Sequence, residues 1–149
     1  MMARRVGAPS FGMPPELKEA ETTSAIIGAF FEVYNALGFG FLEGLYMAAL
    51  ERELIAHGHQ VGREVYVPVH YRGTELGRQR LDMVVDEKVI VEGKATEILH
   101  PNASRQLFAY QRATRLEVGL LLHFGPRPRF HRVVCLNDSR PDLPHVRSV

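Results

Sequence analysis

The chain has 149 residues, 46% of them hydrophobic, which is enough for one domain with a buried core. No run approaches the roughly 18 apolar residues of a membrane span, and the basic residues near the N-terminus precede no apolar secretory segment. Cys135 is the only cysteine, which excludes an internal disulfide and favours a reducing cytoplasm.

Charge is unevenly distributed along the sequence, although the net charge is only +1. Up to Lys94 there are 10 Lys or Arg against 13 Asp or Glu, whereas the remainder holds 8 arginines against 4 acids. Arginine matches phosphate oxygens well, so the C-terminal half is compatible with nucleic acid. Charge alone nevertheless favours an ordinary solvated surface.

The first part of the chain predicts an arm and two helices. Residues 1–15 are rich in Gly and Pro and have little hydrophobic pattern, so we expect a flexible N-terminal arm. Apolar residues then recur at three- and four-residue spacing over 16–37, which predicts a helix that Gly38 ends. A second helix is predicted over residues 43–56.

The next part of the chain has the alternating pattern of strands. It predicts strands over residues 61–71, 76–85 and 89–95. Arg72-Gly73 forms the first turn between them and Asp86-Glu87-Lys88 forms the second. Consecutive strands joined by such short turns form a meander.

The last predicted elements complete a layered fold. A third helix opens at residues 101–104, and the apolar run 118–124 predicts a strand covered on both faces. A final strand over 130–136 precedes a loose tail, residues 137–149. The order ααβββαββ predicts an α/β fold, with a mixed central sheet flanked by helices in one domain over residues 16–136.

The three-residue turn at residues 86–88 sets the register of the hairpin around it. If Val85 pairs with Val89, then Asp82 lies opposite Glu92, and directly opposed side chains are about 5 Å apart. A two-residue turn would move Asp82 to the other face relative to Glu92. The chemistry of this hairpin therefore depends on the turn.

Alternation along the two strands predicts one polar and one apolar face. Arg80 and Asp82 share the polar face with Glu92 and Lys94. The opposite face holds the apolar residues Leu81, Met83, Val85, Val89 and Val91. One face of the hairpin is thus expected to build core, while the other gathers charge.

Two opposed carboxylates favour a hard divalent cation between them, and Mg²⁺ binds one or two carboxylates with water and phosphate oxygens. A neighbouring lysine, Lys94, could help deprotonate water or stabilise charge on a phosphate. These are the parts of a phosphodiester-hydrolysing site. The alternative is a solvent-facing ladder in which Lys94 and Arg80 simply neutralise the two acids.

Four short motifs occur in order: GFLEGLY at 40–46, RLD at 80–82, EGK at 92–94 and QLFAY at 106–110. Together they resemble the GxxExxY family of the PD-(D/E)xK nuclease superfamily, over about residues 16–136. The resemblance implies a restriction-endonuclease-like core of helix, three-stranded meander, helix and strand.

The resemblance also implies residue roles. Asp82 and Glu92 would bind the metal together with the backbone carbonyl of Gly93, Lys94 would be the catalytic lysine, and Gln106 would orient water or phosphate. Gly93 departs from the family, which usually has a bulky apolar residue there. Glycine in a strand can mark a bulge, and a bulge would disturb the spacing of Glu92 and Lys94.

Other motif residues have two interpretations each. Glu43 either caps the second helix or assists at the metal site. Tyr110 either contacts substrate or packs in the core, and Tyr46 is equally a core candidate. Arg80 and Arg105 are expected to contact substrate.

The sequence therefore predicts a small Mg²⁺- or Mn²⁺-dependent nuclease of bacterial type, acting on DNA rather than RNA. The alternative is a nucleic-acid- or protein-binding module on the same fold with little or no catalysis. A homodimer could supply further binding surface. DNA repair, defence against foreign DNA and a toxin-like role all stay open.

Overall fold

The computed structural model describes residues 18–137, so the predicted arm 1–15 and the predicted tail beyond Asn137 lie outside it. Five strands form one sheet in the order β1-β2-β3-β4-β5. The β3–β4 pair is parallel and the other pairs are antiparallel, so the sheet is mixed. The elements are α1 (Ala20–Leu37), α2 (Glu43–Ala56), β1 (Val61–Tyr71), β2 (Thr74–Val85), β3 (Val89–Lys94), α3 (Ala103–Arg112), β4 (Val118–Phe124) and β5 (Pro128–Val134).

The predicted order of elements and the α/β class are confirmed, and several boundaries differ. Strand β2 begins at Thr74 instead of residue 76, β3 ends at Lys94 instead of residue 95, and β5 ends at Val134 instead of residue 136. Helix α1 begins at Ala20, because Glu19 has a left-handed backbone, φ 53°, that a helix cannot continue through. Strand β5 begins at Pro128, two residues earlier than predicted, because Phe124 already pairs with Pro128 across a short turn.

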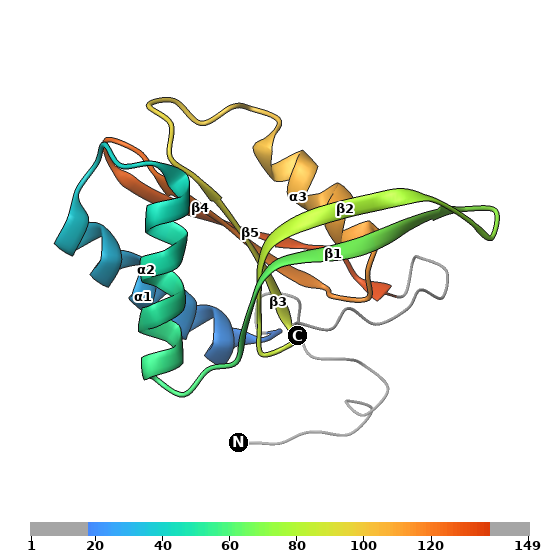
Figure 1. Ribbon diagram of the computed structural model, residues 1–149, viewed down its shortest axis with the longest axis horizontal. Coiled ribbons are helices and arrows are strands. Elements are labelled where there is room, and N and C mark those ends of the chain that lie inside the picture. Colours follow the sequence, from blue (N-terminus) through green and yellow to red (C-terminus); the bar gives the residue numbers. More distant parts are fainter. Residues whose placement is uncertain (1–17, 138–149) are drawn as a thin grey trace, which may run out of the picture.

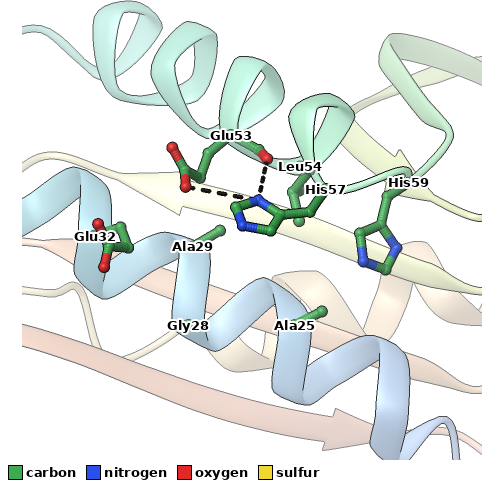
Figure 2. Close-up of a pocket in the computed structure, with 8 residues that line it drawn as sticks. All are labelled: Ala25, Gly28, Ala29, Glu32, Glu53, Leu54, His57 and His59. Atoms are coloured by element: carbon green, nitrogen blue, oxygen red, sulfur yellow. Dashed lines mark hydrogen bonds and ion pairs between the residues drawn. The ribbon is translucent and has the colours of Figure 1, made fainter.

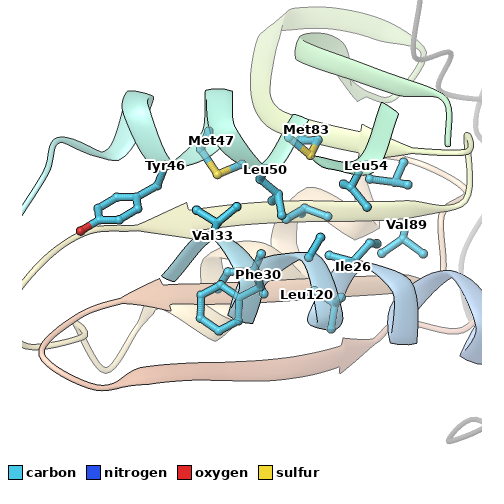
Figure 3. Packing of buried hydrophobic residues seen from close by; sticks show 14 of the residues in the cluster. Ile26, Phe30, Val33, Tyr46, Met47, Leu50, Leu54, Met83, Val89 and Leu120 are labelled. Carbon is cyan, nitrogen blue, oxygen red and sulfur yellow. The ribbon is translucent and has the colours of Figure 1, made fainter. Parts of the chain in front are cut away.

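Helices cover both faces of the sheet (Figure 1). Along β4, Leu120 and Leu122 pack against the α1 and α2 side, whereas Leu121 packs against the α3 side. All of β4 is buried, as the continuous apolar run predicted. Figure 3 shows the α1 and α2 side, where Met47 and Leu50 lie over the strands beside Phe30. None of the described helices is long and apolar enough to cross a membrane.

The predicted hairpin register between β2 and β3 is confirmed. Val85 pairs with Val89, and Met83 pairs with Val91. The turn between them therefore contains three residues, two of which, Asp86 and Glu87, have positive φ angles. This register is what brings the predicted acidic residues to the same end of the hairpin.

The predicted apolar face of β2 is wrong at one residue. Leu81 packs with Val84 on the α3 side, whereas Met83 packs on the α1 and α2 side. The strand changes face between them, at the position where β1 and β2 lack a Glu64–Asp82 pair and Glu64 has a left-handed φ of 53°. Asp82 lies at this change of face.

Tyr46 holds the loop before α2 in place. Its ring is fully buried and stacks on Phe124, with centroids 4.4 Å apart. Its hydroxyl donates to the Gly38 carbonyl and accepts a hydrogen bond from the Phe41 amide at 3.2 Å. Tyr46 is therefore a core residue that fixes the chain just before Glu43.

Tyr46→Phe is expected to destabilise the protein by about 1–3 kcal/mol, because the Gly38 carbonyl and the Phe41 amide lose the hydroxyl that pairs with both. Urea unfolding followed by circular dichroism measures this free energy. Tyr66→Phe is the control, since Tyr66 is 59% exposed and should unfold like the wild type. Equal stability of both variants would contradict the structural role of the Tyr46 hydroxyl.

Candidate active site

Strands β2 and β3 separate beyond the Met83–Val91 pair, and two acidic side chains occupy the separation. The Asp82 amide donates to Glu92 Oε2 at 2.9 Å, and the Gly93 amide donates to Asp82 Oδ2 at 3.1 Å. Each carboxylate thus accepts from the backbone of the opposite strand. Asp82 is 8% exposed and Glu92 is 6% exposed, so the two acids lie together in a nearly buried position.

A third carboxylate reaches this position from the start of α2. Glu43 shares a hydrogen bond with the side chain of Asp82. Burial, followed by the charge of Asp82, raises the pKa of Glu43 to about 7, while Lys94 and Arg80 oppose the rise. Leu42 occupies the N-cap position and makes no side-chain cap. The structure therefore places Glu43 with the acids of the sheet.

The crowding of acids also affects Glu92. Burial, followed by the charge of Asp82, raises the pKa of Glu92 to about 8. The Asp82 amide and Lys94 oppose this rise, and Glu43 adds to it. A buried cluster of carboxylates is stabilised either by protons or by a cation.

Two basic side chains lie beside the acids. Arg80 Nη2 lies 3.2 Å from Asp82 Oδ1, and Arg80 Nη1 lies 3.1 Å from Glu64 Oε2. The Arg80 side chain is 44% exposed, so these ion pairs can exchange with another anion. Lys94 ends β3, and its positive charge lowers the pKa of both Glu43 and Glu92. Glu64 was not predicted as a residue of the site, because no motif in the neighbouring sequence marks it as a partner of Arg80.

A pocket of about 470 Å³ opens beside Lys94, between the loop after β3 and the start of α3. Gln106 is exposed and lines this pocket together with His100 and Asn102. The predicted pair of Lys94 and Gln106 is therefore brought to one cavity. Arg105 is exposed on α3 but is not among the residues that line the pocket.

Tyr110 packs in the core, which is one of its two predicted interpretations. It is partly buried and packs against the α3-side core. Burial, followed by the charges of Glu92 and Asp82, raises the pKa of its hydroxyl. Contact with substrate stays a prediction.

A larger pocket of about 610 Å³ lies between α1 and α2 (Figure 2). Its polar residues include His57, whose Nδ1 lies 2.8 Å from the Glu53 carbonyl oxygen and 3.6 Å from the Glu53 carboxylate. None of the residues predicted for the site lines this pocket. The predicted site residues and this larger pocket thus lie on different parts of the molecule.

Gly93 does not form a bulge. Strand β3 pairs with β4 without a shift, from Val89 with Val118 through to Lys94 with His123. A Cβ at residue 93 would lie 2.5 Å from Met47 Sδ of α2. Close packing of the helix against the strand therefore explains the glycine, and the spacing of Glu92 and Lys94 is kept.

Gly93→Ala is expected to destabilise the protein by about 1–3 kcal/mol, because the added methyl overpacks the core beside Met47. Urea unfolding measures the change. Gly77→Ala is the matched control, since a Cβ there meets nothing within 4 Å. An undisturbed Gly93→Ala protein would contradict the packing explanation.

The donor chemistry of the site fits a hard divalent cation. Asp82 and Glu92 supply two carboxylates, the number that Mg²⁺ commonly takes from protein. Burial, followed by the charge of Asp82, raises the pKa values of Glu43 and Glu92, and a cation would favour the ionised form of both acids. Within residues 18–137, however, no three His, Cys, Asp or Glu side chains lie where they could together hold a metal ion. The fit therefore concerns the two carboxylates and the Gly93 carbonyl.

Comparison with known proteins gives a family. The family model described as the PD-(D/E)XK nuclease superfamily matches residues 20–133. Members of that superfamily typically use divalent metals. A solved structure described as "Crystal structure of SSO0001" matches with a TM-score of 0.49 and 18% identity, over 79% of this chain and 59% of that chain. The chain therefore spans less than two thirds of that protein.

Proposed function

Because the chain belongs to the PD-(D/E)XK nuclease superfamily, we propose that it is a metal-dependent nuclease that hydrolyses phosphodiester bonds, in DNA rather than RNA. The observation that carries the proposal is the convergence of Glu43, Asp82 and Glu92 beside Lys94, where β2 and β3 separate. Such a group of acids with one lysine is suited to a phosphate and its cation.

Asp82, Glu92 and the Gly93 carbonyl would hold Mg²⁺ or Mn²⁺. The cation would polarise the scissile phosphate and lower the pKa of a water bound to it. Two nearly buried carboxylates on adjacent strands offer such an ion fixed positions. The continuous pairing of β3 with β4, from Val89 to Lys94, holds the backbone of Glu92 in place.

The remaining residues would handle the proton and the charge. Lys94 would stabilise negative charge on the phosphate as water attacks and the bond to the leaving oxygen breaks. Glu43, whose carboxyl group lies with Asp82, would accept the proton of that water. Gln106 would orient the water or a phosphate oxygen from the pocket beside Lys94. Tyr110, Arg80 and Arg105 would contact the substrate strand.

The motif order supports the narrower assignment to the GxxExxY family. Cys135 is the one cysteine of the sequence, which supports a reducing, cytoplasmic setting. The alternative binding module is favoured by one observation: the carboxylates of Asp82 and Glu92 already accept from backbone amides, and Asp82 also pairs with Arg80. A site satisfied in this way could be purely structural, and a homodimer could then provide the binding surface.

Incubating the purified protein with single-stranded, double-stranded and branched DNA and with RNA, with and without Mg²⁺, tests the proposal. We expect cleavage of DNA that requires Mg²⁺ or Mn²⁺ and stops when the metal is chelated. Salt-sensitive binding without cleavage under any of these conditions would support the binding module instead.

A further inference from the structure

The outer halves of β1 and β2 leave the layered core and form a two-stranded ribbon, residues 66–80 (Figure 1). This ribbon is called the arm from here on and is distinct from the N-terminal segment 1–15. Residues 69–78 are all exposed. An isolated pair of strands is marginally stable by itself, and this part of the arm buries little against the helices. Core packing therefore does not explain the side chains that it carries.

The exposed side chains of the arm include aromatic and basic ones. Directly opposed residues of an antiparallel pair share a face, so Tyr66 lies beside Arg80, and Arg78 lies beside Pro68. Tyr66 is 59% exposed, and the Arg78 side chain is 68% exposed. At the tip, the Arg72 guanidinium lies 5.3 Å from the centre of the Tyr71 ring.

The arm continues directly into the candidate active site. Arg80, at its base, donates to Asp82 Oδ1 at 3.2 Å. The register shift between Val69 and His70 adds twist to the ribbon between base and tip. The one acid within the arm, Glu75, lies 3.7 Å from Arg78 Nε in an exposed ion pair of little net strength. A DNA phosphate could therefore replace Glu75 as the partner of Arg78.

We propose that the arm binds duplex DNA beside the cleaved bond, with Arg72 and Arg78 on backbone phosphates. This rests on the proposed function, because it places the substrate of the same site. The major groove of B-DNA, about 12 Å wide, admits a two-stranded ribbon. The deep, narrow major groove of duplex RNA does not. The chemistry of the arm therefore favours duplex DNA.

The test compares the double variant Arg72→Ala, Arg78→Ala with a control of equal charge, Arg52→Ala, Lys88→Ala. Arg52 and Lys88 are exposed and lie outside the arm, on α2 and in the β2–β3 turn. Binding to a fluorescent DNA duplex is measured without metal between about 50 and 200 mM salt. The arm variant should bind about tenfold or more weakly, with a salt slope reduced by about 2, one for each lost phosphate contact. The control should bind and unfold like the wild type.

A separate measurement distinguishes failure of the arm from failure of the proposed function. Hydrolysis of bis(p-nitrophenyl) phosphate by the unaltered protein reports catalysis without the arm. Weaker binding by the arm variant supports the arm even if this hydrolysis is absent. Binding by the arm variant equal to that of the control overturns the proposal. A change of sedimentation with unchanged DNA binding also overturns it, because the arm would then contact a second copy.

Discussion

Lys94→Ala is expected to slow magnesium-dependent DNA cleavage by about 100- to 10,000-fold while leaving the fold intact. Lys94 is the last residue of β3, half-buried and close to Glu43 and Glu92. Its ammonium would stabilise charge on a phosphate bound in the pocket that Lys94 lines. Single-turnover cleavage of a labelled duplex measures the rate, and thermal unfolding checks the fold.

Two variants make this result specific. Lys88→Ala removes the same charge from the exposed β2–β3 turn and should cleave at the wild-type rate. Asp82→Asn keeps an oxygen that can accept from the Gly93 amide but removes the carboxylate, so it should lose cleavage as Lys94→Ala does. A Lys94→Ala protein as active as Lys88→Ala would place the chemistry elsewhere.

The second large effect concerns pH and metal acting together on stability. The pKa of Glu92 is about 8 in the folded protein, against an ordinary value of 4.5. Between these values the folded protein holds a proton that the unfolded chain releases. Since the unfolded state then binds fewer protons, the free energy of unfolding should fall as pH rises through this window. Mg²⁺ should reverse the loss, because it replaces the proton, and its affinity should rise with pH.

Urea unfolding at about pH 5 and about pH 9, with and without Mg²⁺, measures this linkage. Glu92→Gln keeps an oxygen for the Asp82 amide but does not titrate. Without metal it should exceed the wild-type stability at the higher pH by on the order of 1 kcal/mol or more, and Mg²⁺ should stabilise it less. An identical pH dependence in wild type and Glu92→Gln would exclude Glu92 as the source.

The sequence predicted the hairpin register and the helix order because local signals specify them. The polar turn at residues 86–88 and the flanking valines permit one register, Val85 with Val89, that keeps both sets of apolar residues buried. It did not predict the position of Leu81. That depends on the left-handed backbone of Glu64, on another strand, and glutamate gives no sign of such a conformation.

Gly93 shows a second limit of sequence reasoning. A glycine inside a strand indicates either a bulge or a close approach. The choice depends on Met47, which is distant in sequence and reaches Gly93 only when α2 packs on the sheet. The same packing separates the two motif residues of α2. Tyr46 points into the core against Phe124, while Glu43 meets Asp82.

The most direct test of the account is anomalous diffraction from crystals of the protein soaked in Mn²⁺. We expect an anomalous peak for manganese bound by Asp82 and Glu92, next to the Gly93 carbonyl and close to Glu43. A peak confined to another place, such as the pocket that contains Glu53 and His57, or no peak at the two acids, would contradict it.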